Sequence, residues 1–121
     1  MAEILVIDDD PRLRRLLARV LKNAGHTVHE AANGTAGIRL FRQVRPALVI
    51  TDLVMPDAEG IETIQELRRD APTLPILAIS GGSNHSLYLR AAIKLGATAS
   101  LGKPFGNDDL LRVVAILLQP A

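Results

Sequence analysis

The sequence contains no cysteine and no tryptophan, and aromatic residues make up only 2% of its 121 positions. Without cysteine the chain can form no disulfide, offers no thiol nucleophile and has no thiolate with which to bind a metal. Neither sign of charge predominates, because 14 basic residues face 13 acidic ones and leave a formal net charge of +1. This balance argues against a dedicated nucleic-acid-binding protein, so we expect no direct nucleic-acid partner.

Long hydrophobic runs are missing as well. Even the apolar run at 113–118 falls far short of the roughly 20 residues that span a bilayer. The first residues show no signal-peptide pattern. We therefore expect no membrane association, a cytoplasmic location and, from the usual size of domains, one domain over residues 1–121.

Short β-rich apolar runs alternate five times with longer stretches in which apolar residues recur at helical spacing. The first of these helices is expected to begin with Asp10 as its N-cap before Pro11, and the last to be capped by Asn107 or Asp108 and to reach about Leu118. The strands are expected at 4–7, 27–31, 47–51, 76–79 and 97–101. Strands that alternate with helices predict a three-layer α/β sandwich, with a parallel sheet and helices on both faces.

Polar residues follow the predicted strands at the point where each strand ends. In an open parallel sheet these carboxyl ends lie along one edge, where ligands bind. The residues concerned are Asp8 and Asp9 after the first strand, Asp52 after the third, Ser80 after the fourth and Lys103 after the fifth. We expect their side chains to converge.

Three carboxylates in one place need a cation, since two charges about 4 Å apart repel by roughly 4 kcal/mol at an effective dielectric constant near 20. Oxygen ligands without histidine or cysteine favour Mg²⁺ over zinc. The charges of Asp8, Asp9 and Asp52 would then be balanced by Mg²⁺ and Lys103. A metal, a lysine and a hydroxyl around one carboxylate are suited to phosphoryl transfer with Asp52 as the nucleophile.

Four segments of the sequence carry a family resemblance. They are ILVIDDD at 4–10, ALVITDLVMPDAEG at 47–60, ILAIS at 76–80 and Lys-Pro-Phe at 103–105. With these motifs the chain resembles, over its full length, the receiver domain of two-component response regulators, in the manner of the chemotaxis regulators. The resemblance implies a flavodoxin-like (βα)5 fold with five parallel strands in the order 2-1-3-4-5.

The resemblance also implies a function. A histidine kinase or a histidine phosphotransfer protein would donate a phosphoryl group to Asp52 in a Mg²⁺-dependent reaction, and the chain would act as a signalling domain rather than as an enzyme on other substrates. It implies that Asp8, Asp9, Asp52 and the main-chain carbonyl of Val54 bind the metal.

In relatives the residues that correspond to Ser80 and Lys103 contact the phosphoryl group, and the bond between Lys103 and Pro104 is cis in many of them. The family usually has an aromatic residue at the position of Ser100. Tyr88 in the fourth helix is a candidate to replace it.

Two surfaces are expected to bind partners. Eight basic residues lie between positions 11 and 45 against the single acidic residue Glu30, and those of the first helix are suited to an acidic kinase or phosphotransfer protein. In the last helix, apolar residues extend beyond the face that can pack against the core. By the resemblance, a downstream protein target or a second copy of the chain would dock on the fourth helix, fifth strand and fifth helix.

Two other functions use the same residues. A Mg²⁺-dependent phosphatase would also have an aspartyl nucleophile, but Asp8 to Asp10 run directly into Pro11 and leave no room for a cap over a substrate. A receiver-like docking or dimerisation module that acts independently of phosphorylation is the main alternative. The complete acidic set argues against this module, and Ser100 argues slightly for it.

Overall fold

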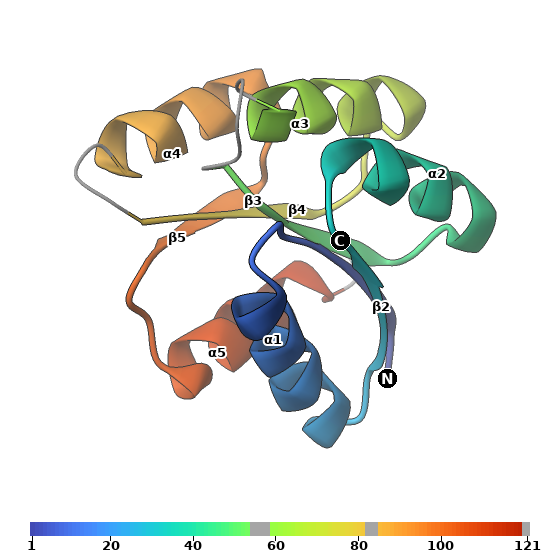
Figure 1. The fold of residues 1–121 in the computed structure, drawn as a ribbon, viewed down its shortest axis with the longest axis vertical. Helices are drawn as coiled ribbons and strands as arrows, with labels where there is room; N and C mark the ends of the chain where they lie inside the picture. Colours follow the sequence, from blue (N-terminus) through green and yellow to red (C-terminus); the bar gives the residue numbers. More distant parts are fainter. Residues whose placement is uncertain (54–58, 82–84, 120–121) are drawn as a thin grey trace.

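The computed structural model describes residues 1–53, 59–81 and 85–119 of the chain. Five strands alternate with five helices along this sequence (Figure 1). The elements are β1 (Glu3–Ile7), α1 (Pro11–Asn23), β2 (Thr27–Ala31), α2 (Gly34–Val44), β3 (Leu48–Asp52), α3 (Glu59–Asp70), β4 (Ile76–Ser80), α4 (His85–Leu95), β5 (Ala99–Gly102) and α5 (Asn107–Leu117). None of these described helices is long and apolar enough to cross a membrane.

All strand pairs are parallel, and the strands lie in the order β2-β1-β3-β4-β5. Helices α1 and α5 cover one face of the sheet, and α2, α3 and α4 cover the other (Figure 1). This is the predicted flavodoxin-like sandwich with the predicted strand order. The order reverses direction at β1 and β3, and in such sheets ligands bind at the carboxyl ends of the strands beside that point.

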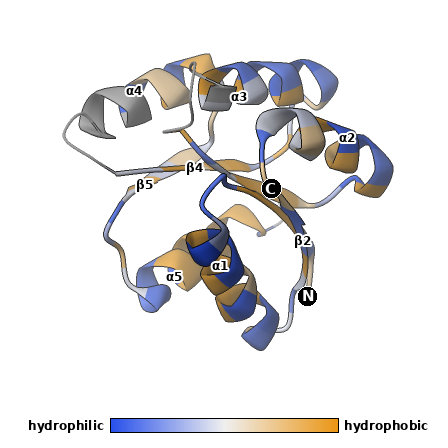
Figure 2. Cartoon of the chain, viewed as in Figure 1, coloured by the Kyte–Doolittle hydropathy of each residue, from blue (hydrophilic) through white to orange (hydrophobic). Residues whose placement is uncertain are grey.

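Burial on both faces explains why the central strands are continuous apolar runs. In β1, Leu5 and Ile7 pack against the layer of α2, α3 and α4, whereas Ile4 and Val6 pack against α1 and α5. The apolar residues are concentrated on the strands and the inner sides of the helices (Figure 2). The sheet therefore separates two apolar clusters, one under each helical layer.

The observed strand ends differ from the predicted ones by one or two residues. β1 begins at Glu3 rather than Ile4, β3 and β4 each end one residue later, at Asp52 and Ser80, and β5 ends at Gly102 rather than Leu101. β3 begins at Leu48 rather than Ala47, and β5 begins at Ala99 rather than Ala97. Ala97 lies between α4 and β5, and its N–H is tied back to the helix because it donates to the carbonyl oxygen of Ala92 at 2.9 Å. The N-cap of α5 is Gly106 rather than Asn107 or Asp108.

Helix α2 approaches the sheet closely at Gly37. A Cβ atom at this position would lie 2.8 Å from Cγ1 of Ile7, which is fully buried in β1. We expect Gly37→Ala to lower the free energy of unfolding by about 1–3 kcal/mol, because a core residue must shift to make room. Urea unfolding measures this value. Gln43→Ala, at an exposed position of the same helix, is the control and should change stability little; equal stability of both variants would contradict the prediction.

Candidate functional site

The strand register brings the predicted site residues to one edge of the sheet. In the pairing of neighbouring strands, Ile7 lies opposite Thr51, and Asp52 lies opposite Ile79. Asp8 and Asp9 therefore leave β1 beside Asp52 at the end of β3. Ser80 ends β4 opposite Gly102, the residue before Lys103. The convergence expected from the sequence is present.

Three carboxyl groups form a cluster at this edge. One carboxylate oxygen from each of Asp8, Asp9 and Asp52 lies within 4.8 Å of the other two. Asp8 is fully buried and Asp52 is only 3% exposed, whereas Asp9 is open to solvent. The cluster is thus closed on the protein side and open on the side of Asp9.

Asp8 is the most constrained member of the cluster. Its Oδ1 accepts a hydrogen bond from the N–H of Asp10 at 2.9 Å, while its buried Oδ2 has no hydrogen-bond partner among the described residues. Burial, together with the negative charge of Asp52, raises the pKa of Asp8 from 3.8 to about 7. This buried oxygen is therefore available to a cation or a donor that enters the site.

Lys103 supplies the positive charge of the site. Its Nζ donates to Oδ2 of Asp52 at 3.1 Å, and its main-chain N–H donates to the carbonyl oxygen of Ser80 at 2.7 Å. Gly81 makes room for this lysine, because a Cβ atom at Gly81 would lie 3.2 Å from both Cβ and Cδ of Lys103. The peptide bond between Lys103 and Pro104 is cis, as expected from the resemblance.

Of the remaining predicted site residues, the structure describes Ser80 and Ser100. Ser80 is fully buried, with its Oγ 3.5 Å from the carbonyl oxygen of Gly81. Ser100 is half-buried in β5, opposite Ala78 of β4. Val54 and the side chain of Tyr88 lie outside the described residues, so their roles stay predictions.

Three of the eight basic residues between positions 11 and 45 make contacts within the described part of the protein, and one of them is Arg45, whose guanidinium lies 5.2 Å from the centre of the Phe41 ring. Arg14 Nη1 donates to the carbonyl oxygen of Asp8 at 2.8 Å, and Arg42 Nε donates to Oδ2 of Asp70 at 2.8 Å. Arg14 belongs to the first helix, whose basic residues were expected to bind a partner, and its contact with the site was not predicted. A helix that begins at Pro11 places both Arg12 and Arg14 in its first turn, so the sequence alone does not distinguish the arginine that contacts the site.

The donor set fits Mg²⁺. Asp8, Asp9 and Asp52 offer only oxygen atoms, which are the ligands that Mg²⁺ prefers, and one or two carboxylates are enough to hold this ion. The buried Oδ2 of Asp8 provides a ligand atom that nothing else in the described part of the chain uses. No histidine belongs to the cluster formed by the described residues.

A flavodoxin-like sheet with clustered acids and a lysine at its carboxyl edge is the arrangement of a receiver domain. Residues 4–115 match the family model described as the response regulator receiver domain. The chain belongs to this family of two-component signalling domains, and the family predicted from the sequence motifs is confirmed.

Individual relatives and solved structures agree with this assignment. The chain is 32% identical over 120 residues to Protein PilH of Pseudomonas aeruginosa, and the match covers 98% of each chain. It is 35% identical to the DNA-binding dual master transcriptional regulator RpaA of Synechocystis, of which it spans 50%. Among solved structures, the receiver domain of NtrX from Brucella abortus has a TM-score of 0.91 at 30% identity, over 98% of this chain and 99% of that one.

The raised pKa of Asp8 predicts how stability depends on pH in the absence of a divalent cation. Between about pH 4 and about pH 7 Asp8 binds more protons in the folded protein than in the unfolded chain, so its contribution to the free energy of unfolding falls as the pH rises through this range. We expect thermal unfolding midpoints to show this fall for the wild type.

Asp8→Asn should flatten the same pH profile, because the substitution removes the titrating group but keeps the size of the side chain. Asp108→Asn, at an exposed position of α5, is the control for loss of an acid elsewhere. Parallel pH profiles for the wild type and Asp8→Asn would contradict the prediction.

Proposed function

We propose that Asp52 accepts a phosphoryl group from the phosphohistidine of a histidine kinase or a histidine phosphotransfer protein. The observation that carries the proposal is the position of the buried Asp52 carboxylate, which is paired with Lys103 on one side and lies within 4.8 Å of the acids Asp8 and Asp9 on the other. We propose further that Asp8, Asp9, Asp52 and the main-chain carbonyl of Val54 hold Mg²⁺. When bound, this ion supplies positive charge to the oxygens of the transferred group.

In the proposed reaction an oxygen of Asp52 attacks phosphorus while the bond from phosphorus to the donor imidazole nitrogen breaks. The imidazole leaves with the electron pair of that bond and takes up a proton. Lys103 balances the charge that collects on the phosphoryl oxygens, because its ammonium group already lies at Asp52. Burial of Asp52 strengthens this interaction by excluding water.

The phosphoryl group would add about one negative charge where Asp52 had its own. We propose that the Ser80 hydroxyl and the Lys103 ammonium then contact the phosphoryl oxygens and shift the protein toward a second conformation. Ser80 ends β4 and Lys103 follows β5, so the change would reach the fourth helix, the fifth strand and the fifth helix. In this role the chain is a phospho-acceptor, not an enzyme that acts on other substrates.

We propose two partner surfaces. A downstream protein or a second copy of the chain would bind to α4, β5 and α5, where Ile93 and Ile116 are 44% and 58% exposed. The phosphodonor would contact α1, whose Arg12, Arg15 and Arg19 are exposed. Such a donor acts in the cytoplasm, which is the location that we propose for this chain.

A docking module that acts independently of phosphorylation is not favoured over this function. Such a module has no need of a lysine paired with a buried aspartate or of two further acids within 4.8 Å. Buried charged groups cost free energy, so a protein that does not use them gains nothing by keeping them.

The proposal predicts the mass of the protein after incubation with a small-molecule phosphodonor. With Mg²⁺ the wild type should gain about 80 Da, the mass of one phosphoryl group, and Asp52→Asn should gain nothing. Asp70→Asn, which removes an exposed acid, should behave as the wild type. If the phosphorylated Asp52 hydrolyses too fast for its mass to be measured, calorimetric measurement of beryllofluoride binding replaces the mass measurement. Phosphorylation of Asp52→Asn, or absence of both mass gain and beryllofluoride binding in the wild type, would contradict the proposal.

Ser80→Ala and Lys103→Ala should separate uptake of the group from the response to it. Both variants should still bind beryllofluoride, more weakly for Lys103→Ala, but should show less change in hydrogen exchange over residues 99–117 than the wild type does. Thr27→Ala, at an exposed position of β2, is the control with a full response. A change in hydrogen exchange as large as that of the wild type in both variants would contradict the proposed roles of Ser80 and Lys103.

A further inference from the structure

Arg14 differs from the other arginines of α1. Arg12, Arg15 and Arg19 are exposed, whereas the side chain of Arg14 is only 16% exposed. Its Nη1 donates to the main-chain carbonyl oxygen of Asp8 at 2.8 Å, and its Nε donates to Oε1 of Glu30 at 3.2 Å. One guanidinium group therefore joins the turn after β1 to the strand β2.

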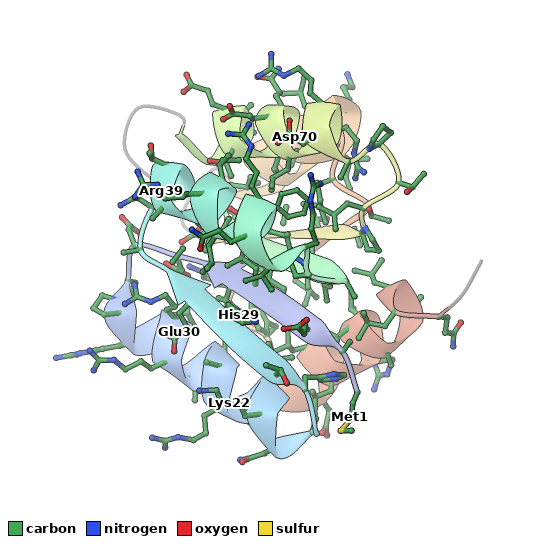
Figure 3. All side chains as sticks on the ribbon, turned by 90° about the vertical axis from the view of Figure 1, so that its right-hand side faces the viewer. Met1, Lys22, His29, Glu30, Arg39 and Asp70 are labelled. Carbon is green, nitrogen blue, oxygen red and sulfur yellow. The ribbon has the colours of Figure 1, made fainter. Side chains whose placement is uncertain are left out.

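The partner of Arg14 in the sheet is well placed to anchor it. Glu30 lies on the part of β2 that faces α1 (Figure 3) and is one residue before Ala31, the last residue of that strand. The main-chain N–H of Asp8 donates to the carbonyl oxygen of Ala31 at 3.1 Å. The N–H and the C=O of Asp8 are thus both tied to the end of β2, the first directly and the second through Arg14 and Glu30.

The contact with the carbonyl oxygen of Asp8 affects two of the three clustered acids. The C=O of Asp8 and the N–H of Asp9 belong to one planar peptide unit. Holding the oxygen of this unit fixes the rotation of the plane, and therefore the direction in which Asp9 leaves Asp8. The carboxylates of Asp8 and Asp9 repel each other and that of Asp52, so a turn without this restraint would relax by moving them apart.

From these contacts we infer that Arg14 is a positioning residue, which holds the turn of Asp8 and Asp9 in the arrangement that binds the metal. The inference rests on the proposed function, because it concerns the same metal site. Arg14 does not touch the acids' carboxylate oxygens in the described contacts; it acts through the main chain of Asp8. Groups that orient metal ligands in this way typically change metal affinity by about 10- to 100-fold when they are removed.

Isothermal titration of the whole chain with Mg²⁺ alone, at about pH 8 where Asp8 is ionised, tests the inference. We expect Arg14→Met to weaken Mg²⁺ binding about tenfold. The matched control is Arg15→Met, which removes the same charge from an exposed neighbouring position of the same helix, and this variant should bind nearly as the wild type does. Equal Mg²⁺ affinity of Arg14→Met and Arg15→Met would overturn the inference.

Arg14→Lys distinguishes orientation from charge. A lysine keeps the positive charge but lacks the fork of donors that reaches two acceptors at once. We expect this variant to bind Mg²⁺ more weakly than the wild type, though less so than Arg14→Met. Wild-type affinity of Arg14→Lys would show that charge alone is needed and would overturn the positioning role.

Thermal unfolding without Mg²⁺ separates positioning from general stability. If Arg14 only stabilised the fold, Arg14→Met would lower the unfolding midpoint and leave Mg²⁺ affinity unchanged, and this result would overturn the inference.

If Arg14→Met does not fold, Glu30→Ala replaces it, because this variant removes the anchor of Arg14 on β2. We expect Glu30→Ala to bind Mg²⁺ more weakly than the wild type, and unchanged binding would overturn the inference. Absence of Mg²⁺ binding by the wild type would overturn the proposed function as well. Wild-type Mg²⁺ affinity of Arg14→Met would overturn this inference alone.

Discussion

Electrostatic repulsion among Asp8, Asp9 and Asp52 is the constraint on which the site depends. Two of these acids are buried, where water cannot screen their charges, and their carboxylate oxygens still lie within 4.8 Å of one another. Such an arrangement is unfavourable unless protons, cations or neighbouring donors offset it. The protein offsets part of it with Lys103 at Asp52, with the N–H of Asp10 at Asp8 and with a raised pKa of Asp8. The fold therefore holds a cluster that is ready for a cation.

The pairing of the parallel strands is what brings the acids of this cluster together. Once β1 and β3 are paired in register, the residues that follow them must lie side by side, and the same holds for β4 and β5. The apolar runs of the strands determine where the sheet is buried, and the polar residues at their ends determine what the sheet edge can bind. Stability and chemistry are thus encoded in adjacent positions of the same short segments.

This local encoding explains how much the sequence could predict. The meeting of Asp8, Asp9, Asp52, Ser80 and Lys103 at one edge could be predicted because each follows or ends a recognisable strand, and the family resemblance implied the strand order. The difference in burial between Asp8 and Asp9 was not predicted, since it depends on how the turn packs. Arg14 was missed for a related reason: the sequence contains several arginines in α1, and only the packing against β2 distinguishes the one that turns inward. The space that Gly81 leaves for Lys103 is likewise a tertiary feature.

The separation of the interior into two apolar clusters has a consequence for how such a domain can change. Residues of α1 and α5 contact the strands from one side, and those of α2, α3 and α4 contact them from the other, so side chains of the two helical layers do not share a common cluster among the described residues. Energetic effects of distant substitutions that share no partners add almost independently. The two layers can accordingly accumulate substitutions separately, so that one outer surface can acquire a new binding specificity while the packing beneath the opposite layer is preserved.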